Sequence, residues 1–276
     1  MRTSPTARIE VLVPDFPCGH IRFALFDFDG TLSLIREGWQ TIMISFMVEE
    51  LSKVPLSGDP AETARVVRKF VTDLTGKQTI YQMIRLAEEV ASRGGQPLTP
   101  LEYKREYHSR LWERIKGRVE ALRAGLVEPD ELMVPGSRNF LEAMRRRGVS
   151  CLLVSGTDQV FVLEEAKLLG ISRFFEAIYG AIDDYKRFSK QMVIDRILAK
   201  HQLSGPALVT LGDGYVEIEN TRNVGGIAVG VASREAERSG IDEWKRSRLI
   251  AAGAHIIIPD FQEHEALMSL LFSDRR

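Results

Sequence analysis

The sequence predicts an α/β protein in which a mostly parallel sheet carries helices on both faces and an all-α segment is inserted. Three observations support this prediction. An apolar stretch at residues 22–27 has the composition of a strand buried on both faces. Residues 34–134 then place apolar side chains at helical spacing, and from residue 149 onward strand-like and helical segments alternate. We therefore expect a core of residues 1–33 and 135–276 and a helical cap domain of residues 34–134.

Length and composition are those of a globular protein. The 276 residues, 44% of them hydrophobic, carry a formal net charge of −1, which does not favour a nucleic-acid partner. No apolar run approaches the roughly 18 residues of a membrane span, and no signal-peptide pattern opens the chain. The two cysteines, Cys18 and Cys151, indicate neither a disulfide framework nor a zinc site. We expect a cytoplasmic protein without a membrane partner, and the oligomeric state stays open.

Two strands are expected before the helical segment. Residues 8–13 alternate weakly and suit a short additional strand, whereas residues 22–27 form the main one. Four helices then follow in the cap. Asp59 before Pro60 and the capping box Thr99–Glu102 mark the starts of the second and fourth. The expected helical ranges are 39–54, 60–75, 78–92 and a helix from residue 100 onward.

The core pattern resumes at Pro135-Gly136, where a helix runs to Arg147 and leads into a second buried strand at residues 149–154. The rest of the chain alternates between the two kinds of element, which favours a mostly parallel sheet. The expected elements are helix 158–169, strand 177–179, helix 190–201, strands 207–211 and 226–231, helix 243–252, strand 255–258 and a final helix.

Two acidic residues, Asp27 and Asp29, follow the main strand directly, before a turn at Gly30. Ligands of open α/β sheets bind beyond the carboxyl ends of the strands. Two carboxylates at that edge suit a hard cation together with a nucleophile or an acid/base pair. The alternative is a simple turn, because Asp and Gly are common turn residues.

Two further segments suit the binding of an anion. In Val154-Ser155-Gly156-Thr157, a hydroxyl and free backbone N–H groups follow a strand, although strand-to-helix turns often carry Ser or Thr merely as caps. Lys190 begins a helix behind Ser189, a plausible N-cap, so its ammonium lies near a helix N-terminus. Lys186 is a competing candidate.

A third segment, Leu211-Gly212-Asp213-Gly214-Tyr215-Val216-Glu217, indicates a cation site. An apolar strand ends in a Gly-flanked Asp213 with Glu217 four residues later, and hard divalent metals bind carboxylate oxygens on short, bendable loops. A dinucleotide-binding fingerprint fits poorly, because Glu217 stands where its third glycine belongs and would repel a pyrophosphate.

Taken in order, Asp-Phe-Asp-Gly-Thr, Val-Ser-Gly-Thr, the helix-initial Lys190 and Gly-Asp-Gly-Tyr-Val-Glu resemble the haloacid dehalogenase superfamily of phosphohydrolases. The resemblance implies a Rossmann-like three-layer sandwich. The middle segment resembles the helical cap of the phosphoglycolate phosphatase and β-phosphoglucomutase branch in position and helicity. Glu217 stands where the family often has Asp, so its role as a ligand of the metal or of water stays open.

The resemblance also implies roles for individual residues. Asp27 would be the nucleophile that becomes an aspartyl phosphate, and Asp29 the acid that protonates the leaving oxygen and then the base that activates water. Magnesium would be held by the Asp27 carboxylate, the Asp29 carbonyl and Asp213, with Glu217 as the further candidate ligand. Ser155, Gly156 and Lys190 would bind the phosphate oxygens.

The cap is expected to select the substrate. Lys77, Tyr81 and Arg85 follow a glycine turn between the second and third helices, a mixture able to bind hydroxyls and anions, although a solvated loop has similar composition. The basic stretch at residues 104–123 is more consistent with an amphipathic helix than with nucleic-acid binding. The expected substrate is a small phosphorylated metabolite, either a sugar or a polyol phosphate.

The sequence thus predicts a magnesium-dependent phosphatase that uses an aspartyl-phosphate intermediate. A phosphomutase on the same scaffold is not separated from it by these motifs, and a catalytically idle phosphate-binding regulatory module is the alternative outside enzymes. A dehalogenase is disfavoured because it needs neither the Asp29 acid nor a metal site at Asp213. A phosphonatase would need a Schiff-base lysine in the cap, for which Lys53 and Lys77 are candidates.

Overall fold

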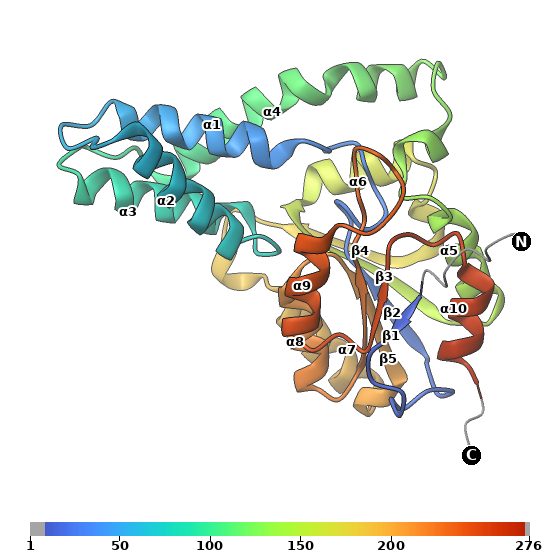
Figure 1. Ribbon diagram of the computed structural model, residues 1–276. Coiled ribbons are helices and arrows are strands. Elements are labelled where there is room, and N and C mark those ends of the chain that lie inside the picture. Colours follow the sequence, from blue (N-terminus) through green and yellow to red (C-terminus); the bar gives the residue numbers. More distant parts are fainter. Residues whose placement is uncertain (1–8, 274–276) are drawn as a thin grey trace, which may run out of the picture.

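The computed structural model describes residues 9–273, and its centre is a seven-stranded sheet with the strand order β1-β7-β6-β5-β2-β3-β4 (Figure 1). Five of the six strand pairings are parallel, and β1 alone runs antiparallel, on β7. This confirms the predicted mostly parallel α/β fold. The strands are β1 Glu10–Val11, β2 Phe23–Phe26, β3 Ser150–Asp158, β4 Phe175–Ala181, β5 Leu208–Gly212, β6 Ile227–Val231 and β7 Ile256–Ile258.

Helices cover both faces of this sheet, and the alternation of side chains along β2 shows how the layers form. Phe26 packs with residues of α5, α6 and α10, whereas Leu25 packs with α7 on the opposite face, next to α8 and α9. The result is a three-layer sandwich. The helices are α5 Ser137–Arg146, α6 Gln159–Leu168, α7 Lys190–His201, α8 Tyr215–Asn223, α9 Glu243–Ala251 and α10 His264–Leu271.

Four helices between β2 and β3 form a helical lobe beside the sheet (Figure 1). Two of them start as their sequences predict: Asp59 accepts a hydrogen bond from the backbone N–H of Glu62, and Thr99 forms a capping box with Glu102. The lobe consists of α1 Trp39–Ser52, α2 Pro60–Asp73, α3 Thr79–Ser92 and α4 Pro100–Arg123. Short 3-10 turns lie at Pro129–Leu132, Ser172–Phe174, Tyr185–Arg187 and Gly205–Ala207.

The two chain segments that join the lobe to the sheet pair with each other. Ser33 bridges Met133 in antiparallel fashion, and the backbone N–H groups of Leu34 and Val134 donate to the carbonyls of Leu132 and Leu32. This pairing ties the entrance and the exit of the lobe together at one place, so the lobe is connected to the sheet through a narrow two-stranded ribbon.

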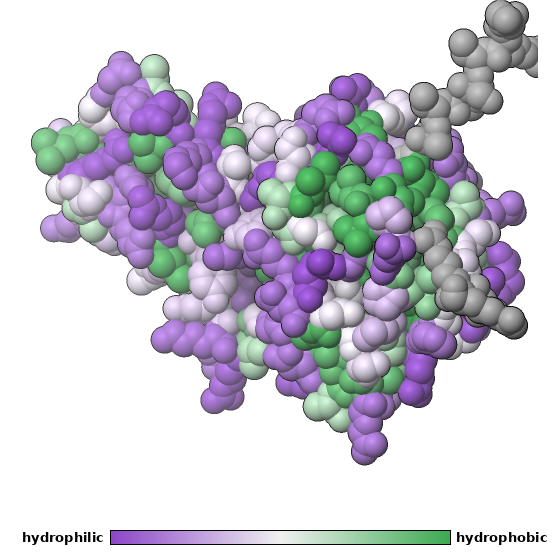
Figure 2. Space-filling view, turned by 60° about the horizontal axis from the view of Figure 1, so that its bottom comes forward, coloured by the Kyte–Doolittle hydropathy of each residue, from purple (hydrophilic) through white to green (hydrophobic). Residues whose placement is uncertain are grey.

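The surface of the lobe is mainly hydrophilic (Figure 2). Exposed ion pairs one turn apart on its helices, such as Arg65 with Glu62 and Lys69 with Asp73, account for part of this character. Within the described residues, no helix combines the length and the apolar character needed to cross a membrane.

Three elements differ from the sequence-based expectation. β3 continues past Val154 to Asp158, with a shift in its pairing to β4 over those residues. The expected strand at residues 8–13 is shortened to Glu10–Val11, and residue 8 lies outside the described part of the chain. The stretch after Asp213, expected to be a loop, is the helix α8. Glu217 lies in its first turn, where it accepts a hydrogen bond from the backbone N–H of Gly214.

Candidate active site

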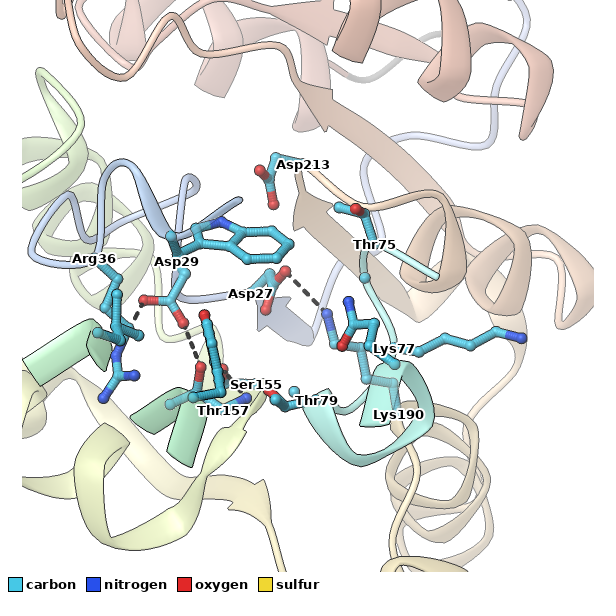
Figure 3. Close-up of a pocket in the computed structure, with 16 residues that line it drawn as sticks. Asp27, Asp29, Arg36, Thr75, Lys77, Thr79, Ser155, Thr157, Lys190 and Asp213 are labelled. Atoms are coloured by element: carbon cyan, nitrogen blue, oxygen red, sulfur yellow. Dashed lines mark hydrogen bonds and ion pairs between the residues drawn. The ribbon is translucent and has the colours of Figure 1, made fainter. Parts of the chain in front are cut away.

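The carboxyl ends of three neighbouring parallel strands meet at one cavity of about 80 Å³ (Figure 3). Asp27 follows β2, Ser155 lies near the end of β3, and Asp213 follows β5. Lys190, the first residue of α7, reaches the same space. The strand order places β2 between β3 and β5, so Asp27 is central among these groups.

Lys190 connects two buried carboxylates. Its ammonium lies 2.9 Å from Asp27 Oδ2 and 2.9 Å from Glu217 Oε2, and all three side chains are almost completely buried. Ser189 fixes the start of α7 by accepting a hydrogen bond from the Met192 backbone N–H. Burial acts to lower the pKa of Lys190, but the two carboxylates outweigh it and raise the pKa. Lys190 therefore stays charged at physiological pH.

The two carboxylates respond differently to this shared lysine. Burial raises the pKa of Asp27 well above its usual value, with Lys190 opposing the rise and Glu217 and Asp213 adding to it. For Glu217, burial also acts to raise the pKa, but the pairing with Lys190 prevails and lowers it. A further positive charge close to Asp27 would favour its ionised form.

Asp29 has one carboxylate oxygen that accepts a hydrogen bond and one that accepts none from the described residues. Thr157 Oγ1 donates to Asp29 Oδ2 at 2.7 Å, whereas Oδ1 is buried and, among the described residues, receives no hydrogen bond (Figure 3). Burial raises the pKa of Asp29 to about 7, although Arg36 opposes this. Such a carboxyl can both give and take a proton near neutral pH.

Arg36 lies at the side of Asp29 and is itself neutralised. Its Nε is 3.9 Å from Asp29 Oδ1, while two of its nitrogens bind the carboxylate of Glu165 on α6, at distances down to 2.6 Å. The sequence analysis assigned no role to Arg36, Glu165 or Thr157. One signal was present: Glu165 shares the buried side of α6 with Val162 and Ala166, and a buried acid requires a partner.

Three carboxylates come close enough to share a metal ion. Asp27, Asp213 and Glu217 each offer an oxygen, and these atoms lie within 4.8 Å of one another. An all-carboxylate set suits a hard divalent cation, and such a cation would act with Lys190 to lower the raised pKa of Asp27. The Asp29 side chain lies outside this group and points to Thr157 instead. Glu217 already uses both oxygens, on Lys190 and on the backbone of Gly214.

Asp213 has a second buried lysine beside it. Lys245, from α9, lies 2.8 Å from Asp213 Oδ2 and 2.7 Å from Glu235 Oε1. The carboxylates raise the pKa of Lys245 against the lowering effect of burial. Nothing in the local sequence distinguishes Lys245 from exposed charged residues of the same helix, so the sequence analysis passed over it.

The helical lobe closes one side of the cavity with the loop at residues 75–78. A Cβ at Gly156 would lie 2.8 Å from the carbonyl oxygen of Lys77, and one at Gly214 would lie 3.0 Å from the Cα of Gly76. Gln78 donates to the Phe188 carbonyl at 2.7 Å. The loop thus contacts the strand-end turns through backbone atoms, and both glycines are needed for that approach.

The other side of the lobe is held to the core by charge. Lys104 of α4 lies 2.7 Å from Asp158 at the end of β3, and Arg123 of α4 pairs with Glu164 of α6. The α4 side of the lobe is therefore joined to the sheet by ion pairs, whereas the loop side is joined by neutral contacts.

A family model describing haloacid dehalogenase-like hydrolases matches residues 21–225, which include all four motif segments. The chain belongs to the haloacid dehalogenase-like hydrolase family. This confirms the resemblance inferred from the order of the motifs.

Solved structures of this family share the fold of the chain at low sequence identity. A predicted phosphoglycolate phosphatase from Haemophilus somnus is 17% identical, with a TM-score of 0.58 over 90% of this chain and 98% of that chain. A haloacid dehalogenase-like protein from Streptococcus pneumoniae is 20% identical, with a TM-score of 0.58 over 91% and 98%. A putative β-phosphoglucomutase from Thermotoga maritima is 16% identical, with a TM-score of 0.52 over 91% and 100%.

A curated relative is similar over a shorter stretch. A 5'-nucleotidase from Pseudomonas aeruginosa is 28% identical over 124 residues, which are 45% of this chain. The match spans about half the length of that relative, 55%.

The haloacid dehalogenase-like motifs place most of the predicted site residues in one cavity. Asp27, Asp29, Ser155, Gly156, Lys190 and Asp213 all line it. Glu217 does not line it, because it lies behind Lys190. Of the two lysines that the sequence left open, Lys190 lines the cavity and Lys186 is exposed in a 3-10 turn.

The three residues expected to select the substrate are placed differently. Lys77 lines the cavity, but its side chain is exposed and extends away from Asp27 (Figure 3). Tyr81 lies outside this cavity and packs edge-on against Tyr185, with ring centres 5.6 Å apart. Arg85 is outside it as well and pairs with Glu89 on its own helix. The helices of the lobe instead contribute Trp39, Thr79, Gln82, Tyr107 and Leu111.

Proposed function

We propose that this protein is a magnesium-dependent phosphatase that hydrolyses a small phosphomonoester through an aspartyl phosphate on Asp27. The observation that carries the proposal is the pairing of two unlike acids in one cavity. Asp27 is held by Lys190 at 2.9 Å, and Asp29 has a pKa raised to about 7 and an oxygen that accepts no hydrogen bond from the described residues. One acid is positioned as a nucleophile and the other as a proton carrier. Membership of a hydrolase family agrees with this assignment.

In the first step, a carboxylate oxygen of Asp27 attacks phosphorus and the bond from phosphorus to the leaving oxygen breaks. Protonated Asp29 gives its proton to that oxygen, so an alcohol departs rather than an alkoxide. Lys190, Ser155 and the backbone N–H of Gly156 bind the oxygens of the phosphoryl group. Magnesium, held by Asp27, Asp213 and the Asp29 carbonyl, would offset the repulsion between nucleophile and phosphate.

In the second step, the Asp29 carboxylate accepts a proton from water, and the water oxygen attacks phosphorus. The bond from phosphorus to Asp27 breaks, phosphate leaves, and both acids return to their initial protonation states. Thr157 supports this role, because it holds Oδ2 of Asp29 and leaves Oδ1 available for the proton. Glu217 supports the site from behind by fixing Lys190.

The test is to trap the covalent intermediate. Asp29→Asn retains the nucleophile but lacks the base of the second step, so a phosphoryl adduct should accumulate on Asp27 when magnesium and an activated aryl phosphate are supplied. Acid quenching and peptide mass spectrometry locate the adduct. The double variant Asp27→Asn with Asp29→Asn is the matched control and should carry no adduct. An adduct on another residue, or none in either variant, would overturn the proposal.

A nucleoside 5'-monophosphate is the second candidate substrate, favoured by the match to the 5'-nucleotidase. The cavity of about 80 Å³ has room for several water-sized groups, which favours a small leaving group over a nucleoside. A panel of phosphomonoesters of increasing size distinguishes the two substrates.

The same panel separates the hydrolase from the other two functions. Phosphate release without added bisphosphate favours hydrolysis over a phosphomutase, and no turnover of any member would favour a regulatory module.

A further inference from the structure

One polar side chain of the lobe faces the cavity without a partner. Gln82 of α3 is 2% exposed, and it lines the same cavity as Asp27 and Asp29. Its Oε1 atom is buried and accepts no hydrogen bond from the described residues. A buried amide oxygen without a partner costs free energy, and native proteins seldom leave one in that state. A ligand that fills the cavity would satisfy it.

The backbone of α3 holds Gln82 firmly in place. Ile80, Met83 and Leu86 are all buried, so Gln82 lies on the core-facing side of the helix and is polar among apolar neighbours. A rigid helix defines the position of a binding group better than a loop does. This fixed position distinguishes Gln82 from the exposed Lys77 side chain.

The chemistry of a carboxamide indicates which group it binds. Its oxygen accepts and its nitrogen donates, which complements a hydroxyl, because a hydroxyl does both. Its neighbours in the wall from the lobe helices, such as Trp39, Tyr107 and Leu111, carry no charge. The one arginine in the cavity, Arg36, is already bound in bidentate fashion by Glu165. The cation that the lobe brings to the cavity is Lys77 of the loop, whose side chain is exposed and extends away from Asp27 (Figure 3). The lobe helices, which carry Gln82, therefore offer no cation to a second anionic group.

We propose that Gln82 binds a hydroxyl of the leaving group and so selects phosphomonoesters whose leaving group is small, hydroxylated and uncharged. The inference rests on the proposed phosphatase function and narrows its substrate class to polyol-like monophosphates. It disfavours bisphosphates and phosphorylated carboxylic acids, which would bring a second negative charge against the uncharged side chains of the lobe helices.

Three substrates of similar size separate these properties. Glycerol 3-phosphate has a hydroxylated leaving group, propyl phosphate lacks the hydroxyls, and phosphoglycolate carries a carboxylate. Wild-type protein with magnesium should show a kcat/KM at least about tenfold higher for glycerol 3-phosphate than for either other compound. Gln82→Leu should lose about tenfold or more on glycerol 3-phosphate and change little on propyl phosphate.

Binding without turnover provides a second measurement. In an Asp27→Asn background, calorimetry should show weaker binding of glycerol 3-phosphate when Gln82→Leu is added, and unchanged binding of propyl phosphate. Arg85→Gln is the matched control on the same helix, because Arg85 does not line the cavity. It should leave both affinities unchanged.

Each outcome tests the role of Gln82, the proposed phosphatase function, or both. Equal losses on glycerol 3-phosphate and propyl phosphate in Gln82→Leu would overturn the inference and show that Gln82 supports the fold or the shared chemistry. A wild type that prefers phosphoglycolate would overturn it too, while leaving the phosphatase proposal intact. Absence of phosphate release from all substrates, including an activated aryl phosphate, would overturn both.

Discussion

The two walls of the cavity are built from different kinds of groups. On the strand edge, each charged group lies near an opposite charge, as Lys190 does between Asp27 and Glu217, and Lys245 between Asp213 and Glu235. The helices of the lobe contribute uncharged side chains. The difference teaches where each property of the proposed phosphatase would reside: the paired charges of the strand edge would bind the phosphoryl group that all substrates share, and the uncharged side chains of the lobe helices would meet the part that varies. Changes on the two walls should therefore differ in kind.

The largest expected effect is on the strand edge. Asp27→Asn retains the shape of the side chain but removes the nucleophilic charge, so turnover should fall by several orders of magnitude on both glycerol 3-phosphate and an aryl phosphate. Phosphate release measures the loss, and circular dichroism should show an intact fold. A loss of turnover limited to one of the two substrates would show that the strand edge does not act on the group that all substrates share.

Removal of the metal ion should have the second-largest effect, and it should reduce the turnover of all substrates. With EDTA, turnover should drop below about one hundredth of its initial value, because the buried acids lose their neutralising charge. Magnesium should restore it, and calcium should restore little because its larger, looser coordination spoils the alignment. Asp213→Asn should raise the magnesium concentration needed for half-maximal activity. Activity that is unchanged by EDTA would show that the reaction needs no metal ion at the strand edge.

The pH dependence of kcat/KM tests the role of Asp29 within the strand edge. Asp29 has a pKa of about 7 and must be protonated to serve as the acid. For an alkyl phosphate, kcat/KM should therefore fall about tenfold per pH unit above about pH 7, as Asp29 loses its proton. An aryl phosphate, whose leaving group needs no proton, should show no such fall. Identical profiles for both substrates would show that Asp29 does not act as the acid.

The smallest effect is expected on the outer face of the lobe. Arg85 is paired with Glu89 and does not line the cavity, so Arg85→Ala should keep the ratio of kcat/KM values for glycerol 3-phosphate and propyl phosphate within about twofold of wild type. Gln82→Leu, three residues earlier on the same helix, provides the comparison. A change of substrate preference in Arg85→Ala would show that selection is not confined to the side chains that line the cavity.

The strand-edge residues could be predicted from the sequence because their signals are local. An apolar run that ends in Asp27, or a capped helix that starts at Lys190, identifies both the element and its end. The pair formed by Arg36 and Glu165 gives no such signal, because its members lie 129 residues apart. α8 was missed because Gly212 and Gly214 on either side of Asp213 are typical of a loop, and the helix itself spans only nine residues.

Of the three lobe residues expected to select the substrate, Tyr81 and Arg85 lie outside the cavity for a different physical reason. Composition indicated a polar region after the glycine turn, but successive helical residues point in directions about 100° apart, and the sequence does not fix how the helix is rotated. Tyr81 and Arg85, four residues apart, share a side that faces away from the cavity, whereas Gln82 faces it. The sequence therefore identified the segment of the lobe that contributes to the cavity, but not the face of the helix that lines it.

The lobe is attached to the core by different kinds of contact on its two sides. The paired ribbon at Ser33 and Met133 ties the lobe to the sheet, and Lys104 with Asp158 holds the α4 side. The loop at residues 75–78 is held by close contacts and by the hydrogen bond of Gln78. We therefore expect the ribbon and the α4 side to act as a hinge and the loop to separate from the core first. An opening at the loop would lie beside the start of α7, so in the proposed reaction the released phosphate should depart past Lys190.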